Sequence, residues 1–95
     1  MKLRFTRQAL RDLEDIAGYL CEHNPAAALR VREALLESLK DLADFPELGR
    51  RQSVEGVRKY VTRRYSYLVY YAVDAETVIV LTIRHPARQR SHDDA

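Results

Sequence analysis

The chain has 95 residues, of which 46% are hydrophobic, and it carries a formal net charge of +2 at pH 7. This length supports one domain with one modest core, and the hydrophobic fraction is that of a globular chain, which excludes wholesale disorder. No run is apolar for long enough to cross a membrane, and no charged-then-apolar leader opens the chain. We therefore expect a single domain over residues 1–95, located in the cytoplasm and without a membrane partner.

The charge is divided unevenly between the two halves of the chain. Residues 1–49 carry seven Lys or Arg and nine Asp or Glu, a balance of −2, whereas residues 50–90 carry nine and three, a balance of +6. This asymmetry favours an anionic or acidic partner for the second half. The alternative is a solvated sheet face whose arginines discourage pairing between sheet edges.

Cysteine, histidine and glycine give no sign of a metal site, a cofactor or a redox centre. Cys21 cannot form an internal disulfide and has no CxxC partner, which fits a reducing compartment. His23 and His92 have no zinc-like arrangement of Cys, His or carboxylate neighbours in the sequence. The three glycines are far apart, so no glycine-rich phosphate loop is present. We expect neither a metal nor a cofactor.

The start of the chain predicts a short strand and an amphipathic helix. Lys2–Phe5 alternates polar and apolar residues, as a strand that joins a later sheet would. Thr6 is a suitable N-cap, and apolar residues then recur at spacings of three and four from Arg7 to His23. The apolar stripe comprises Leu10, Leu13, Ile16, Ala17 and Leu20. The residues expected to face solvent are Arg11, Asp12, Glu14 and Asp15.

A second helix is expected from about Pro25 to Asp44. Asn24 is a good N-cap and Pro is tolerated at the first helical position, so the two helices form a hairpin. One apolar stripe comprises Ala28, Val31, Leu35, Leu39 and Leu42, and a flanking stripe comprises Leu29, Leu36 and Ala43. So wide an apolar surface packs against both the first helix and a sheet, or leaves its flank for a protein partner.

The last third of the chain predicts a meander of three strands after a loop. Phe45-Pro46 ends the second helix, and residues 47–51 continue as a loop in which Gly49 is available for a positive φ. Three runs rich in Val, Ile, Thr and Tyr follow, over residues 57–61, 67–73 and 77–83. The second run is apolar on both faces, so it belongs inside the sheet.

The third run alternates with a period of two. This places Ile79, Leu81 and Ile83 on one face and Val78, Val80 and Thr82 on the other. The expected fold is α+β in the order β-α-α-β-β-β, with the helical hairpin packed on one face of a small antiparallel sheet. The open face is expected to carry the basic residues, and residues 89–95 to form a polar tail.

Several different short motifs follow one another along the chain. The first helix contains Ala9, Leu13, Ile16 and Tyr19, an Asn-Pro break follows, and the second helix closes in Phe45-Pro46-Glu47-Leu48-Gly49-Arg50. The strands contain Gly56-Val57-Arg58, then Arg64-Tyr65-x-Tyr67-x-Val69-Tyr70-Tyr71, then Val80-Leu81-x-Ile83-x-His85, followed by Arg88. Over residues 3–88 this order and spacing resemble the ParE/RelE superfamily of toxins from type II toxin-antitoxin pairs, and the ParE branch in particular.

The resemblance implies a toxin that a cognate antitoxin neutralises, in a complex that is commonly a hetero-oligomer. Characterised ParE-like relatives poison DNA gyrase, whereas RelE-like relatives are ribosome-dependent ribonucleases that cut messenger RNA. The arginines expected to contact the target are Arg58, Arg63, Arg64, Arg84 and Arg88. The residues expected to contact the antitoxin are Leu29, Leu36 and Ala43.

The choice between gyrase and messenger RNA depends on groups that can transfer protons. Cutting RNA without a metal needs a base, cations for the transition state and an acid for the leaving oxygen. Some RNA-cutting relatives end in a His-Tyr pair, where this chain has His85-Pro86 and no tyrosine after Tyr71. We therefore expect a gyrase inhibitor rather than an enzyme. The alternatives are a RelE-like ribonuclease that uses His85 as acid or base and a non-toxic module that binds antitoxin.

Overall fold

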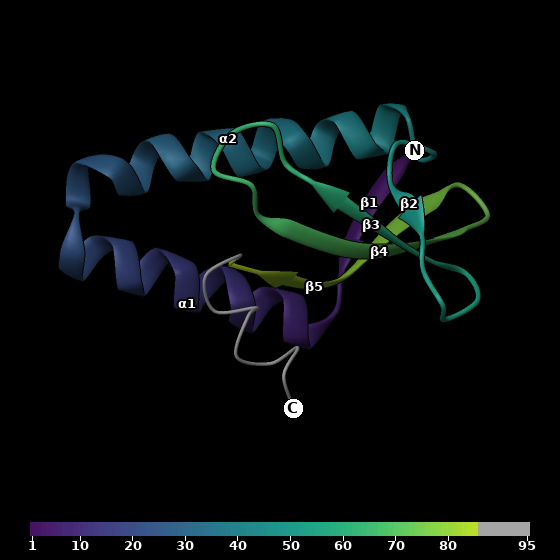
Figure 1. Ribbon diagram of the computed structural model, residues 1–95, viewed down its shortest axis with the longest axis horizontal. Helices are drawn as coiled ribbons and strands as arrows, with labels where there is room; N and C mark the ends of the chain where they lie inside the picture. Colours follow the sequence, from purple (N-terminus) through teal and green to yellow (C-terminus); the bar gives the residue numbers. More distant parts are fainter. Residues whose placement is uncertain (86–95) are drawn as a thin grey trace.

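The computed structural model describes residues 1–85, so Arg88 and the expected polar tail over residues 89–95 lie outside the described residues. Its elements are β1 (Lys2–Phe5), α1 (Arg7–His23), α2 (Pro25–Asp44), β2 (Arg50–Arg51), β3 (Val57–Val61), β4 (Leu68–Asp74) and β5 (Thr77–Arg84). The predicted α+β order is confirmed, with β2 added inside the expected loop (Figure 1). Neither of the two described helices is long and apolar enough to span a membrane.

The strands form one mostly antiparallel sheet in the order β1-β5-β4-β3-β2. β4 lies inside the sheet between β5 and β3, as its apolar pattern predicted. β1 pairs in parallel with β5, with Phe5 opposite Val80, so the expected antiparallel sheet has one parallel edge strand. Only a tight turn forces neighbouring strands to be antiparallel, and the helices and the meander separate β1 from β5. β2 was missed because two residues show no alternation to detect.

Both helices begin at the caps that the sequence predicted. The Thr6 hydroxyl accepts a hydrogen bond from the Ala9 amide at 3.1 Å, and the Asn24 side chain accepts one from the Ala27 amide at 3.2 Å. These bonds satisfy amides that a helix start leaves unpaired, which fixes where each helix begins. The two helices run antiparallel and are joined by a short connection at one end (Figure 1).

The core lies between the helical hairpin and one face of the sheet. Its buried members are Ala9, Ile16, Val31, Leu35, Leu39, Leu42, Tyr67, Val69, Tyr71, Val78, Val80 and Ile83. Two residues expected on the buried stripe of α1, Leu10 and Ala17, are exposed instead. The fully buried Ala9 takes the place of Leu10, because a small side chain lets the helix approach the sheet closely.

β5 contains a bulge that the sequence pattern did not reveal. Tyr71 pairs with Val80, but the preceding residue, Tyr70, pairs with Thr82, so Leu81 has no partner on β4. An extra residue shifts the alternation by one, and Ile83 is therefore buried on the same side as Val80. The expectation that Ile83 shares a face with Leu81 was wrong.

The loop that leaves α2 is fastened to the inner side of β4. The Tyr71 hydroxyl donates to the Pro46 carbonyl at 2.6 Å and accepts from the Gly49 amide at 2.8 Å. Gly49 was expected to use a positive φ, but it is Gly56 that does so, with φ at 81°. Gly49 is required for a different reason, namely that the Tyr71 ring leaves no space for a side chain.

Candidate functional site

A row of cations and one aromatic ring crosses the sheet face that points away from the helices. Val69 and Tyr71 are buried, so the residue between them, Tyr70, projects from the opposite face. The register places Lys59 directly across from Tyr70, and Arg50 directly across from Lys59. The guanidinium carbon of Arg84 lies 5.8 Å from the centre of the Tyr70 ring. We refer to Arg50, Lys59, Tyr70 and Arg84 as the open-face stripe.

The turn between β3 and β4 presents two further arginines on a fixed backbone. The buried Thr62 hydroxyl donates to the Arg64 carbonyl at 2.7 Å and accepts from the Tyr67 amide at 2.9 Å. Tyr65 and Ser66 have φ values of 68° and 52°, in the left-handed region that side chains disfavour. Their conformation persists because the Thr62 hydrogen bonds hold both ends of the turn.

The end of β5 lies beside this turn. Arg84 pairs with Leu68 at the start of β4, and the His85 ring meets the Tyr67 ring edge-on with 5.2 Å between ring centres. The exposed Arg63 and Arg64 lie in the turn that joins the end of β3 to the start of β4, so the structure gathers both with Arg84 and His85 at one end of the sheet. Clustered cations of this kind suit a partner that carries phosphates.

Arg58 has a different role from the other predicted arginines. It lies opposite Tyr71, on the side of the sheet that faces the helices. Its guanidinium donates to the Gly49 carbonyl at 2.8 Å and to the Glu47 carbonyl at 3.4 Å. Arg58 therefore braces the loop after α2 and is not part of the open-face stripe.

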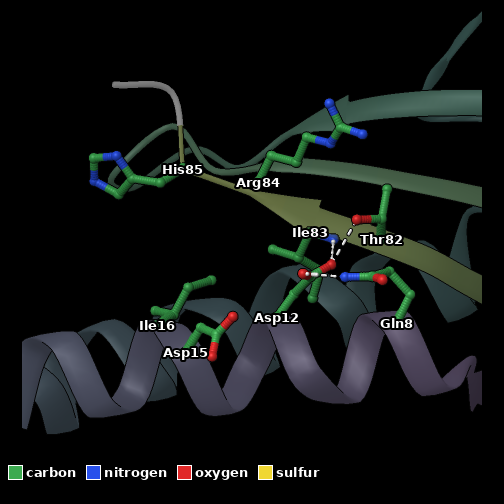
Figure 2. A pocket seen from close by; sticks show the side chains of 8 residues that line it. All are labelled: Gln8, Asp12, Asp15, Ile16, Thr82, Ile83, Arg84 and His85. Atoms are coloured by element: carbon green, nitrogen blue, oxygen red, sulfur yellow. Dashed lines mark hydrogen bonds between the residues drawn. The ribbon is translucent and has the colours of Figure 1, made fainter. Parts of the chain in front are cut away.

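A cavity of about 560 Å³ lies between α1 and the end of β5 (Figure 2). It is lined by Gln8, Asp12, Asp15, Ile16, Thr82, Ile83, Arg84 and His85. Asp12 accepts hydrogen bonds from the Thr82 hydroxyl at 2.5 Å and the Ile83 amide at 2.9 Å, and its other oxygen accepts from Gln8 at 2.8 Å. The expectation that Asp12 faces solvent was wrong.

The sequence contained a signal for the position of Asp12. It lies three residues after Ala9 and four before Ile16, and both of these residues are buried. Helical periodicity places all three on one face. The signal was missed because a carboxylate was assumed to face water. Among residues 1–85, no three His, Cys, Asp or Glu side chains gather closely enough to hold a metal ion.

An apolar groove of about 360 Å³ runs between the outer sides of α1 and α2. Leu29 and Leu36, both predicted to contact an antitoxin, line it and are 65% and 52% exposed. Its other lining residues are Leu13, Glu14, Ile16, Ala17, Leu20, Cys21, Ala28, Val31, Arg32, Leu35 and Leu39. Ala43 lies elsewhere, near the C-terminal end of α2, where its carbonyl accepts from the N-terminal ammonium group of Met1 at 3.0 Å.

The architecture, two helices packed on a five-stranded and mostly antiparallel sheet, is shared with a solved toxin-antitoxin system. The structure of the chromosomal ParDE toxin-antitoxin system from P. aeruginosa resembles this chain with a TM-score of 0.77 and 27% identity, over 90% of this chain and 95% of that one. The family model described as "ParE toxin of type II toxin-antitoxin system, parDE" matches residues 3–90. This protein belongs to the ParE toxin family.

Two relatives in sequence agree with this assignment. The chain is 31% identical over 88 residues to Y4kP of Sinorhizobium fredii, which covers 93% of this chain and 91% of that protein. It is 32% identical over 84 residues to Toxin RelE3 of Caulobacter vibrioides, which covers 87% of this chain and 91% of that protein. The resemblance drawn from the motifs is confirmed, and the protein is a type II toxin of the ParE/RelE superfamily.

Proposed function

We propose that this toxin inhibits DNA gyrase in the cytoplasm by binding it, and that the open-face stripe and the Arg63-Arg64 turn form the contact surface. The stripe is the observation that supports the proposal. It sets three cations and one aromatic ring along a face that the helices leave uncovered. Guanidinium groups pair with phosphate oxygens, and aromatic rings stack on bases, so this surface suits an enzyme that holds DNA.

Two observations favour binding over catalysis. Arginines stabilise phosphate charge, but cleavage of RNA also requires groups that give and take protons. The carboxylate of Asp12 is occupied by the hydrogen bonds from Thr82 and Ile83. His85 is followed by Pro86, which has no proton to transfer, where some ribonuclease relatives place tyrosine.

A cognate antitoxin is proposed to dock in the groove between the helices. Leu29 and Leu36 expose large apolar side chains beside the half-buried Leu13 and Leu20 of α1. An amphipathic helix laid in such a groove buries its apolar face against leucines from both sides. Because the groove lies on the helices and the stripe on the open sheet face, substitutions in one surface leave the other intact.

A second candidate function is cleavage of messenger RNA at the ribosome. It is favoured by the position of His85, which lies next to Arg84 and close to the Arg63-Arg64 turn. An imidazole there acts as general acid or base, while the arginines stabilise the charge of the transition state. The two functions share the cations and differ in their need for His85.

The deciding experiment is supercoiling of relaxed plasmid by purified gyrase, with and without the antitoxin-free protein. We expect loss of supercoiling and accumulation of cleaved DNA, with Arg84→Ala weaker than the wild type. The matched control is Arg30→Ala, which removes an exposed arginine from α2 and should inhibit as the wild type does. Full gyrase activity at every toxin concentration would contradict the proposal. Cut messages on ribosomes would then support the second candidate.

A further inference from the structure

The last residues of β5 have a strand on one side and a helix on the other. β1 ends at Phe5, opposite Val80, so within residues 1–85 no strand pairs with the outer edge of β5 beyond that point. The N-terminal part of α1 takes its place. The Thr6 hydroxyl donates to the Leu81 carbonyl at 2.6 Å, and Asp12 accepts from the Ile83 amide at 2.9 Å. Side chains of α1 and of its N-cap therefore satisfy polar groups that a free strand edge would expose.

The bulge at Leu81 decides on which face Arg84 falls. With the extra residue, Ile83 enters the core and Arg84 lies over Tyr70 on the open face. A one-residue change of register moves every later side chain to the other face of a sheet. Without the bulge, Arg84 would point into the apolar core and Ile83 would point outward. The direction of Arg84 thus depends on a single extra residue.

Asp12 binds both residues that follow the bulge. One carboxylate oxygen accepts from the Thr82 hydroxyl and from the Ile83 amide, while Gln8 donates to the other oxygen and orients the group. Figure 2 shows these bonds on the α1 side of β5, with the Arg84 side chain extending away from α1. Thr82 and Ile83 keep their partners Tyr70 and Val69 on β4, so the Asp12 bonds hold this segment from its other edge.

We propose that Asp12 is a positioning residue, which fixes the register of β5 after the bulge and so turns Arg84 toward the target. We call its bonds to Thr82 and Ile83 the Asp12 clamp. The inference rests on the proposed function only in assigning Arg84 to the target surface. It does not depend on whether that target is gyrase or the ribosome, because both candidates use Arg84.

The clamp needs an acceptor oxygen and not a negative charge, which gives a test by conservative replacement. Asp12→Ala removes the acceptor, whereas Asp12→Asn keeps an oxygen for the Ile83 amide. We expect the Ile83 amide to exchange with solvent about tenfold faster or more in Asp12→Ala, and nearly at the wild-type rate in Asp12→Asn. In NMR spectra of Asp12→Ala, the Arg84 side-chain protons should also lose the ring-current shift from Tyr70.

Growth inhibition on induction supplies the functional measurement. Asp12→Ala should require about tenfold more protein or more for the same inhibition, while Asp12→Asn should retain it. Asp15→Ala is the matched control, because Asp15 lines the same cavity from the same helix, whereas the carboxylate that binds Thr82 and Ile83 is that of Asp12. Gly49→Ala is the control for stability, since it loosens the fold far from the clamp.

The outcomes separate the clamp from a general loss of stability. In both Asp12→Ala and Gly49→Ala, the loss of inhibition can be compared with the loss of unfolding free energy. If the two losses are in the same proportion in both variants, the positioning role is wrong. Unchanged Ile83 exchange and an unchanged Arg84 environment in Asp12→Ala would also overturn it. If Arg84→Ala remains fully inhibitory, the proposed target surface is wrong instead. The exchange rate of the Ile83 amide and the NMR signals of the Arg84 side chain still decide whether the clamp exists.

Discussion

Gly49 lies directly against the ring of Tyr71. A Cβ atom added at Gly49 would stand 2.6 Å from both the Cε1 carbon and the hydroxyl oxygen of Tyr71, and 3.0 Å from the Lys59 carbonyl oxygen. The Gly49 amide also donates to that hydroxyl. This contact fastens the loop after α2 to the central strand β4, and so it links the helical layer to the sheet.

Gly49→Ala should therefore destabilise the protein. Overpacking against a fully buried tyrosine and a backbone carbonyl costs about 1–3 kcal/mol of unfolding free energy. Urea denaturation measures the loss. Gly18→Ala is the matched control, because Gly18 lies inside α1 and, apart from its chain neighbours and the helix's own backbone, no atom of the described residues comes within 4 Å of an added Cβ. That change should stabilise the protein by roughly 0.5–1 kcal/mol. Equal urea midpoints for Gly49→Ala and the wild type would show that the loop accommodates the added methyl group without a loss of stability.

Tyr71→Phe should remove a dependence of stability on alkaline pH. Burial raises the pKa of the Tyr71 hydroxyl above its usual value of 10.0, while the hydrogen bond from Gly49 and the charge of Arg58 oppose that shift. The folded state thus holds the proton more firmly than the unfolded state does. This contribution to stability is complete below pH 10 and decreases as pH rises from there through the folded pKa.

The difference in unfolding free energy between wild type and Tyr71→Phe isolates this effect. At neutral pH the variant should be about 1–3 kcal/mol less stable, because the Gly49 amide and the Pro46 carbonyl lose their partner. Above pH 10 the difference should shrink. Tyr65→Phe, at an exposed position in the β3–β4 turn, should follow the wild type at every pH. A constant gap between wild type and Tyr71→Phe would refute the pKa argument.

Arg84→Ala and Arg58→Ala should have opposite effects. Arg84 lies on the open-face stripe, so its loss should weaken growth inhibition about tenfold or more while thermal stability stays near the wild-type value. Arg58 braces the Gly49 and Glu47 carbonyls, so its loss should lower unfolding free energy by about 1–3 kcal/mol and spare inhibition per folded molecule. If Arg58→Ala loses inhibition and Arg84→Ala loses only stability, the target surface lies on the helix side of the sheet.

His85→Gln should leave growth inhibition intact. Under the gyrase proposal, His85 packs against Tyr67 and takes no part in proton transfer. Glutamine keeps hydrogen-bonding capacity but cannot act as an acid or base near neutral pH. Titrated induction compares the two chains at matched protein levels. If His85→Gln loses inhibition completely and leaves intact the messages that the wild type cuts, the true activity is that of the ribonuclease.

Leu36→Asp should weaken antitoxin binding without affecting toxicity. A carboxylate in the groove must be desolvated against leucines when the partner docks, which costs several kcal/mol. Co-purification of the toxin with its cognate antitoxin provides the measurement. Ala43→Asp is the control outside the groove, and it should still bind. Equal capture of both variants would place the antitoxin on another surface.

Much of the fold was determined by local signals in the sequence. Thr6 and the Asn24-Pro25 pair fixed where the helices begin, because a cap is a contact between residues a few positions apart. The apolar pattern of β4 correctly placed it inside the sheet, since burial on both faces leaves no polar alternation. The order of the motifs identified the superfamily.

The orientation of the site residues was decided only by tertiary structure. The bulge at Leu81 turned Ile83 inward, and β2 turned out to be a strand only because Arg50 meets Lys59. Arg58 donates a hydrogen bond to the loop after α2, and Asp12 accepts one from the edge of β5. Each of these outcomes depends on a partner far away in the chain. Local periodicity reports which residues favour burial, but only the packed sheet determines which polar groups need a partner and where that partner lies.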